Sequence, residues 1–214
     1  MHTYKDNDID ITINQINMGP YSNNGYIITC NATNQSIIID TPAEPEKIIN
    51  QLFNTEVKHI LITHGHQDHL LGFKEICDFT NAPVSCHQND AGLLPHPPDE
   101  TITHNQVINF GNQQIIAIFT PGHTDGSTCY LIGQHLFSGD TLFPGGPGKS
   151  RNHEALIQEI ESISNNLLTL DPNTSVYPGH GTNTSIKNAS EQFSVFSSKP
   201  HDNNLSGDVS WLES

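Results

Sequence analysis

At 214 residues the chain fits one domain of generous size, and its formal net charge is −15, from 8 basic and 23 acidic residues. A surface this negative repels the phosphate backbone of nucleic acids and anionic lipid headgroups, because binding them requires clustered Lys and Arg side chains. The hydrophobic fraction of 34% is modest but comes in short dense runs, so we expect a packed core and neither nucleic-acid nor membrane partners.

The first half of the chain is expected to alternate short strands with two helices, because Gly, Asn and Pro break it into short apolar runs. The expected strands lie near residues 9–16, 26–30, 36–40, 57–63 and 84–86. One helix is expected after the third strand and through Gln51, and a second over residues 70–79. The apolar face of the first helix would consist of Ile48, Ile49, Leu52 and Phe53.

The second half is expected to repeat this scheme loosely. Its strands are expected near residues 106–110, 114–120, 128–132, 136–138 and 174–177. A helix over residues 153–168 would begin after Asn152 as its N-cap, before a further helical segment and a polar C-terminal tail. Its apolar face would consist of Leu156, Ile160, Ile163 and Leu167. We therefore predict one α+β domain over residues 1–214, with similar halves at about 1–105 and 106–200, and two packed sheets with helices outside.

The strongest signal of function is the sequence HGHQDH, which directly follows the apolar strand expected at residues 57–63. Packing does not explain this density of imidazole and carboxylate groups. In an extended segment alternate side chains point the same way, so His64 and His66 can bind one ion together. Asp68 and His69 lie past the turn and can reach a second ion. Neutral imidazole and carboxylate are ligands that zinc takes in catalytic sites.

Three later segments place a ligand-type residue beside glycine at the end of an expected strand. They are PGHT with His123, SGDT with Asp140 and PGHG with His180. Glycine lets the backbone approach a crowded centre, and loops after strand ends hold side chains rigidly and open to solvent. A single histidine after a strand is usually structural, but the four segments together indicate a metal site.

The whole series of motifs resembles the metallo-β-lactamase superfamily, and within it the glyoxalase II-like hydrolases. It consists of Asp40, THGHQDH from Thr63, PGHT from Pro121, SGDTLF from Ser138 and PGHG from Pro178. The resemblance extends from about Ile9 to His180. It implies a four-layer αβ/βα sandwich, in which two packed mixed β-sheets are flanked by helices.

The resemblance also implies a ligand set for two Zn²⁺ ions, with Fe or Mn as the other candidates. The first ion would be held by His64, His66 and His123. The second ion would be held by Asp68, His69 and His180. Asp140 would bridge both ions, and Asp40 would steady a ligating imidazole from outside the ligand set. True β-lactamases of this fold usually carry Cys or Ser where Asp140 lies, so antibiotic cleavage is not expected as the main activity. Leu71 and Asp125 also depart from the family pattern without touching a ligand.

The expected reaction is hydrolysis of a small acyl substrate, a thioester like that of hydroxyacylglutathione hydrolases or an ester. Two ions about 3.5–4 Å apart can share a bridging water and lower its pKa, and the resulting hydroxide would attack the acyl carbon. Asp68 would act catalytically by orienting this hydroxide. The chain after His180 is too short for the glutathione-binding helical domain of full-length glyoxalase II. Lys149 and Arg151 adjoin Asp140 and are candidates to bind a substrate carboxylate, or else a solvated surface pair.

Three alternatives remain open. One is an oxidoreductase like the mononuclear iron persulfide dioxygenases, with His64, His123 and Asp140 as a two-His-one-carboxylate triad suited to Fe(II). Another is a lactonase of the same superfamily. A third is a domain that binds metal or a partner without catalysis. The sequence leaves the oligomeric state undetermined.

The four cysteines are scattered, without the CxxC spacing of a structural zinc site or a redox pair. Cys86 precedes His87, which keeps a metal role for Cys86 open. The first residues lack a signal-peptide core, and no apolar run is long enough to cross a bilayer. We therefore expect a cytoplasmic protein with reduced cysteines.

Overall fold

The computed structural model describes residues 1–213, and residues 2–102 supply the strands of a seven-stranded sheet in the order of the chain. Its first four strands are antiparallel, whereas β4, β5, β6 and β7 run parallel to one another. The strands are β1 (His2–Asp6), β2 (Ile11–Met18), β3 (Asn23–Cys30), β4 (Gln35–Ile39), β5 (Glu56–Leu61), β6 (Val84–His87) and β7 (Glu100–Ile102).

The second sheet has six strands in the order β15-β14-β11-β10-β9-β8, and β11 pairs in parallel with β14. Its other pairs are antiparallel. The strands are β8 (Val107–Phe110), β9 (Gln113–Phe119), β10 (Thr128–Ile132), β11 (His135–Gly139), β14 (Ser175–Pro178) and β15 (Thr184–Ser185). A separate two-stranded ribbon consists of β12 (Leu142–Phe143) and β13 (Gly146–Pro147).

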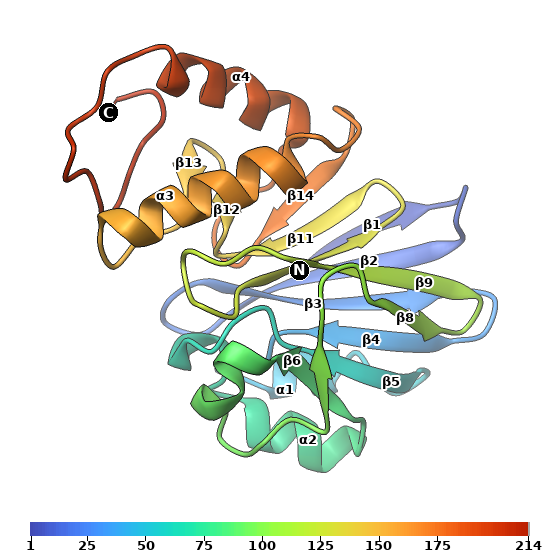
Figure 1. Ribbon diagram of the computed structural model, residues 1–214. Helices are drawn as coiled ribbons and strands as arrows, with labels where there is room; N and C mark the ends of the chain where they lie inside the picture. Colours follow the sequence, from blue (N-terminus) through green and yellow to red (C-terminus); the bar gives the residue numbers. More distant parts are fainter. Residues whose placement is uncertain (214) are drawn as a thin grey trace.

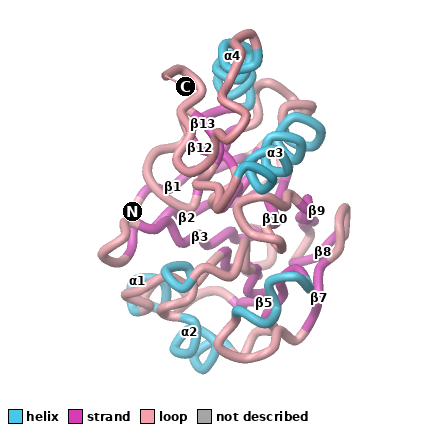
Figure 2. The backbone as a smooth tube through the Cα atoms, turned by 60° about the vertical axis from the view of Figure 1, so that its left-hand side comes forward, coloured by secondary structure: helices cyan, strands magenta, loops and turns pink. Residues whose placement is uncertain are grey.

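The two sheets stack face to face, and helices cover both outer surfaces (Figure 1). The α-helices are α1 (Glu46–Ile49), α2 (Phe73–Thr80), α3 (His153–Ser162) and α4 (Ile186–Ser197). Helices α1 and α2 lie on the first sheet, while α3 and α4 lie on the second, as the tube view also shows (Figure 2). The predicted four-layer sandwich of mixed sheets is confirmed.

Three apolar layers hold this sandwich together. The central layer joins inward-facing residues of both sheets, and Tyr26 of β3 contacts Phe137 of β11 edge to face, with ring centroids 5.0 Å apart. The outer layers bury Ile48 and Ile76 of α1 and α2 on one side, and Leu156 of α3 on the other. Burial of such side chains on both faces of each sheet explains the dense Ile-rich runs of the sequence.

The predicted helix through Gln51 is shorter than expected, because α1 ends at Ile49 and a turn follows. Ile48 and Leu52 are buried as predicted, but Phe53 is 74% exposed, so its placement on the buried face is wrong. Helical periodicity predicts facing only while the helix continues. Because α1 ends at Ile49, the direction of Phe53 is set by the turn that follows.

The helix predicted over residues 153–168 is present in two parts. Asn152 caps α3 by accepting a hydrogen bond from the backbone N–H of Ala155 at 2.9 Å, as predicted. A π-helical turn over Ile163–Leu167 replaces the last α-helical turns, and Ile163 and Leu167 remain buried. Sequence periodicity does not distinguish this wider turn from a regular α-helix, because the apolar spacing stays close to helical.

Several short elements escaped prediction, because they are polar edge strands or strands of two or three residues. They are β1, β7, β12, β13 and β15. The C-terminal tail is also less polar in its contacts than expected. Trp211 is fully buried against Phe193 of α4, with ring centroids 5.2 Å apart, and its backbone N–H donates to the carbonyl of Gly145. One aromatic residue therefore anchors a segment whose average composition is polar.

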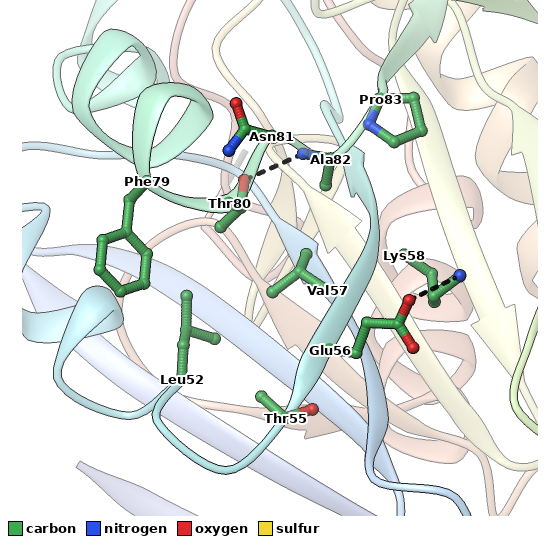
Figure 3. Close-up of a pocket in the computed structure, with 10 residues that line it drawn as sticks. All are labelled: Leu52, Thr55, Glu56, Val57, Lys58, Phe79, Thr80, Asn81, Ala82 and Pro83. Atoms are coloured by element: carbon green, nitrogen blue, oxygen red, sulfur yellow. Dashed lines mark hydrogen bonds and ion pairs between the residues drawn. The ribbon is translucent and has the colours of Figure 1, made fainter.

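A surface pocket of about 370 Å³ opens beside the amino-terminal end of β5 and the end of α2 (Figure 3). Its lining comes from Leu52, residues 55–58 and residues 79–83. The histidine motif follows the carboxyl end of the same strand, so this pocket is separate from the candidate site. Across residues 1–213 no helix is long and apolar enough to span a bilayer.

Candidate metal centre

Five strands end at one edge of the sandwich, and the loops that follow them carry the predicted site residues. Asp40 follows β4, the HGHQDH segment follows β5, and the later loops follow β9, β11 and β14. Chain segments that are far apart in the sequence meet here because the two sheets are stacked. The structure brings the seven predicted ligands together at this edge. They are His64, His66, Asp68, His69, His123, Asp140 and His180.

The first group joins His64, His66 and His123. The Nδ1 of His66 lies 3.1 Å from the Nε2 of His64 and 2.9 Å from the Nε2 of His123. The three ligand atoms lie within 4.8 Å of one another. His64 is 1% exposed and His123 is 9% exposed, whereas His66 reaches the surface. The structure thus brings together the three residues predicted to hold the first ion.

The second group joins Asp68, His69 and His180. The Nε2 of His180 lies 3.2 Å from both the Nε2 of His69 and the Oδ2 of Asp68. Asp68 and His180 remain about a quarter exposed, while His69 is fully buried. The group therefore offers three ligand atoms and an open side, as the predicted second metal site requires.

Asp140 lies between the two groups. Its Oδ2 is 3.7 Å from the Nε2 of His123 and 3.4 Å from the Nε2 of His180, and its Oδ1 is 3.4 Å from the Nε2 of His69. The buried Oδ1 makes no hydrogen bond within residues 1–213. A buried carboxylate oxygen without a donor is costly unless a cation pairs with it. Asp140 is therefore within reach of histidines from both groups.

The separations between the ligand atoms fit a transition-metal ion. Two ligands of a tetrahedral zinc ion, bound at about 2.0–2.1 Å, lie about 3.3 Å from each other. Five of the six pairs of ligand atoms within the two groups lie 2.9–3.6 Å apart, and the sixth pair lies within 4.8 Å. Imidazole and carboxylate donors suit zinc and other borderline metals, and the residues present are suited to a divalent metal cofactor.

Three of the imidazoles, those of His69, His123 and His180, have a hydrogen-bond acceptor beside Nδ1. Nδ1 of His123 donates to the carbonyl of Lys149 at 3.0 Å, and Nδ1 of His180 donates to the carbonyl of Tyr21 at 2.9 Å. Nδ1 of His69 donates to Asp40 at 2.9 Å. Because these oxygens can only accept, each of these Nδ1 atoms carries a proton, and Nε2 is the nitrogen left to bind a metal ion, whereas His66 faces the other ligand atoms through Nδ1. The rings are therefore oriented for metal binding by the protein itself.

Asp40 orients two histidines at once. Its Oδ2 accepts from Nδ1 of His69 and, at 2.8 Å, from the hydroxyl of Thr63, while its Oδ1 accepts from the Thr63 backbone N–H. The Thr63 hydroxyl oxygen lies 3.0 Å from Nδ1 of His64 and, because its own hydrogen is donated to Asp40, accepts a hydrogen bond from that nitrogen. Asp40 is 1% exposed and has a φ of 59°, a strained conformation for a residue with a side chain. This position outside the ligand set is the one predicted for it.

Replacing Asp40 by Asn is expected to weaken metal binding about 10–100-fold, because partners that orient ligating imidazoles contribute on that scale. Competition with a chromophoric chelator measures the change. Asp10→Asn is the matched control, since Asp10 is an exposed aspartate with a similar φ of 52°. An Asp40→Asn protein that binds metal as tightly as the Asp10→Asn control would show that Asp40 does not act on the metal site.

Charge within the metal-free site is arranged for cation binding. Burial lowers the pKa of His64 well below its usual value, and the neighbouring His69 adds to this effect. Burial opposes protonation of His180, but hydrogen bonds to Asp140 and Asp68 outweigh it and raise its pKa to about 10. Burial likewise opposes ionisation of Asp140, but the neighbouring His180 and His69 rings hold its pKa well below the usual range. In the metal-free protein the proton on Nε2 of His180 thus lies between that ring and the carboxylates, where a metal ion would bind.

Sequence reasoning missed two buried polar residues that organise the site. Asn23 is 1% exposed, and its Nδ2 donates to the Oδ2 of Asp68 at 2.8 Å. Asp90 accepts from the backbone N–H of Gly65 and from the hydroxyl of Thr124, both at 2.7 Å. Asp90 thereby ties the histidine motif to the His123 loop. Neither residue belongs to a recognisable motif, so only the tertiary contacts reveal them.

Gly179 allows the His180 loop to approach Asp140. A Cβ at this position would lie 2.2 Å from the Oδ1 of Asp140 and 2.7 Å from the Cε1 of His69. No side chain fits at such distances. The glycine before His180 is therefore required by the close approach of the loop to the centre.

Lys149 and Arg151 lie at the surface beside the centre, and each is paired with a carboxylate. The Nζ of Lys149 is 3.8 Å from Asp208, and Arg151 donates to Asp125 at 2.7 Å. Both side chains are mostly exposed, and they do not converge on one point. Their role toward a substrate carboxylate stays a prediction.

The structure separates Cys86 from the candidate metal centre. Cys86 is 1% exposed within the core under α2, and burial raises its pKa to about 12. A thiol in this state is a poor metal ligand, because the thiolate is the binding form. All four cysteines are free.

Comparison with known sequences agrees with this geometry. Residues 18–180 match the model of the metallo-beta-lactamase superfamily. The chain is 33% identical over 190 residues to the probable hydroxyacylglutathione hydrolase glo2 of Schizosaccharomyces pombe, covering 83% of this chain and 71% of that protein. It is 30% identical over 165 residues to the probable polyketide biosynthesis zinc-dependent hydrolase PksB of Bacillus subtilis, covering 75% and 73%.

Solved structures share the fold. The BLEG-1 B3 metallo-beta-lactamase superposes with a TM-score of 0.77 at 26% identity, covering 84% of this chain and 96% of that chain. TTHA1623 in a di-iron-bound form superposes with a TM-score of 0.71 at 26% identity, covering 83% and 96%. With the family match spanning most of its length and the ligand-type residues gathered at one edge, this chain is a glyoxalase II-like member of the metallo-β-lactamase superfamily.

Proposed function

We propose that this protein is a metal-dependent hydrolase that uses two metal ions, zinc in the first instance, to cleave a small thioester or ester. One observation carries the proposal: two groups of three ligand atoms lie side by side with Asp140 between them. A single structural ion would need only one such group, closed on all sides. The open side at Asp68 and His180 leaves room for a substrate.

When bound, a pair of ions supplies an activated water and polarises an acyl carbonyl oxygen. The protein contributes the placement of the groups around them. Asn23 holds Asp68 by a hydrogen bond to its Oδ2, and the Asp68 side chain stays 25% exposed at the site. Asp68 is thus positioned to accept a hydrogen bond from the attacking water and to orient it toward the acyl carbon, in addition to binding metal.

A pocket of about 470 Å³ adjoins the second group. Its lining residues are Tyr21, Gln67, Asp68 and Leu71. Tyr21 and Leu71 are exposed large side chains, at 62% and 43%, and give the pocket an apolar wall. A pocket of this size and lining suits a small acyl or thiol group beside the reacting carbon.

The similar proteins support the reaction class and the choice of metals. The name of the Schizosaccharomyces pombe relative specifies hydrolysis of a hydroxyacylglutathione, in which the acyl group is joined to sulfur. The Bacillus subtilis relative is named as zinc-dependent, and one structural neighbour was solved in a di-iron-bound form. Zinc and iron are therefore the metals to test first.

The test is elemental analysis of freshly purified protein, followed by turnover of acyl thioesters, esters and lactones. We expect two ions per chain and fastest turnover of thioesters or esters. Preference for lactones would move the assignment to a lactonase. One iron per chain with oxygen uptake on a persulfide substrate would replace it with a dioxygenase. Two bound ions without any turnover would leave a metal-binding domain and end the proposal.

Neutralising Lys149 and Arg151 together is expected to raise KM for an acidic thioester, since a contact remote from the reacting carbon acts alike on ground and transition states. A loss of about 1–3 kcal/mol is reasonable for a charge-assisted hydrogen bond. The Lys149→Ala/Arg151→Ala protein is compared on matched acidic and neutral thioesters. Lys58→Ala/Lys74→Ala, which removes a half-buried lysine of the first sheet and an exposed lysine of α2, is the control for net charge. Equal effects on both substrates would identify the pair as a surface feature.

A further inference from the structure

Helix α3 carries two buried polar residues one turn apart on the face against the His123 loop. Glu159 is 0% exposed and Ser162 is 6% exposed. The Ser162 hydroxyl donates to the carbonyl of Pro121 at 2.7 Å. The Oε1 of Glu159 accepts from the backbone N–H of Gly148 at 3.0 Å. Burying a carboxyl group costs free energy unless it is hydrogen-bonded, and only one of the two oxygens of Glu159 has a partner within residues 1–213.

Glu159 lies directly beneath the His123 loop. A Cβ at Gly122 would lie 2.3 Å from the Cβ of Glu159, and Gly122 has a φ of +146°, which side chains rarely adopt. The loop residue before His123 is therefore in contact with the stem of Glu159. With Ser162 bonded to Pro121 on the other side, α3 supports this loop at two successive positions.

Glu159 also acts on the second segment that contacts His123. Gly148 donates its N–H to Glu159, and the carbonyl of the next residue, Lys149, accepts from Nδ1 of His123. The two hydrogen bonds are joined by one short stretch of backbone. A fixed Gly148 N–H therefore fixes the Lys149 carbonyl, which selects the tautomer of His123. With Nδ1 of His123 held by that carbonyl, its Nε2 points toward His66.

The acceptor role needs no charge. Burial raises the pKa of Glu159 to about 9, the Gly148 N–H opposes this shift, and Asp140 adds to it. The other oxygen, Oε2, makes no hydrogen bond within residues 1–213. A glutamine would keep the carbonyl acceptor at nearly the same place, whereas an apolar residue of similar size would remove it.

We propose that Glu159 is a positioning residue for the metal centre, which holds His123 in its metal-binding orientation from behind through the Gly148–Lys149 segment. The inference rests on the proposed metal role of His123. It assigns to α3 a task that its apolar pattern does not reveal. It also predicts that Glu159 acts on the His64–His66–His123 group and leaves the Asp68–His69–His180 group unaffected.

The test measures one ion at a time. In a His180→Ala background the group with His123 stays complete, and in a His123→Ala background the group with His180 stays complete. Adding Glu159→Leu is expected to weaken zinc binding about 10-fold in the first background, in line with other residues that orient ligands, and to leave the second unchanged. Adding Glu159→Gln is expected to restore binding to within a few-fold. Chelator competition gives each affinity.

Ring-nitrogen NMR of the metal-free protein supplies a second readout. The wild type and Glu159→Gln are expected to show His123 protonated at Nδ1, and Glu159→Leu to show a mixture of tautomers. This measurement needs no metal, so it separates failure of the positioning role from failure of the proposed function. If neither background binds zinc but the His123 tautomer still depends on Glu159, the proposed metal function is refuted and the positioning role of Glu159 stands.

Two controls on the same helix separate positioning from stability. Glu161→Leu removes an exposed glutamate, and Leu156→Ala destabilises the buried face of α3. Neither is expected to change zinc affinity or the His123 tautomer. Glu159→Ser, which admits water, replaces Glu159→Leu if that protein does not fold. Three outcomes would overturn the proposal. Glu159→Leu could lower zinc affinity equally in both backgrounds, Glu159→Gln could lower it as much as Glu159→Leu, or Leu156→Ala could have the same effect as Glu159→Leu.

Discussion

Replacing Asp140 by alanine is expected to lower kcat by several orders of magnitude and to leave no more than one tightly bound ion. Its two oxygens lie within 3.7 Å of histidines from both groups, so its loss removes the link between the ions. Generation of the nucleophile and the spacing of the ions then change together. Steady-state kinetics and elemental analysis of the same preparation measure both effects.

The control for this substitution is Asp78→Ala, which removes an exposed aspartate on α2 that pairs only with Lys74 at the surface. It is expected to match the wild type in metal content and turnover. The bridging role would be disproved by an Asp140→Ala protein that keeps both ions and more than about a tenth of the wild-type kcat.

Removing the metal with a chelator is expected to abolish hydrolysis and to lower the unfolding temperature, because ions that bind only the folded state stabilise it. At an ion concentration about 1,000 times the dissociation constant, this stabilisation is about 4.1 kcal/mol. Thermal unfolding and turnover are measured before chelation, after it, and after zinc is returned. Unchanged turnover in fully metal-free protein would contradict a metal-dependent reaction.

Metal binding is also expected to weaken as the pH falls. Burial opposes protonation of both rings, but hydrogen bonds to Asp140 and Asp68 raise the pKa of His180 to about 10. The charge of Asp40, together with hydrogen bonds to Asp140 and Asp40, raises the pKa of His69 well above its usual value. His180 therefore carries protons on both ring nitrogens at neutral pH in the metal-free protein, and an ion must displace the proton on Nε2. Binding releases protons, so the apparent affinity rises with pH up to the pKa of His180. Calorimetric titration with zinc at pH 6 and pH 8 is expected to show tighter binding at pH 8.

The sequence by itself determined the fold class and the candidate ligands. Ile-rich runs predicted buried strands, and each ligand-type residue stood in a short motif beside glycine at the end of such a strand. These signals are local: a strand, a turn and a polar residue lie within a few positions of one another. The motif order then pointed to the family, and the family model matches residues 18–180.

Local signals were weaker where a residue's environment depends on distant contacts. Phe53 followed the helical pattern but is exposed, because α1 ends before it. Trp211 lies in a polar segment but is buried against α4, because one large side chain outweighs its polar neighbours. Composition and periodicity average over such positions.

Only the tertiary structure decided how the site is oriented. The carbonyl that sets the tautomer of His123 belongs to Lys149, at a sequence separation of 26, and the one that sets the tautomer of His180 belongs to Tyr21, at a sequence separation of 159. Backbone carbonyls are present at every residue, so no sequence pattern marks the ones that matter. Glu159 likewise resembles any glutamate on an amphipathic helix until the packing of α3 places it beneath the His123 loop. Stacking the two sheets is what brings these partners together, and that stacking arises from the fold as a whole.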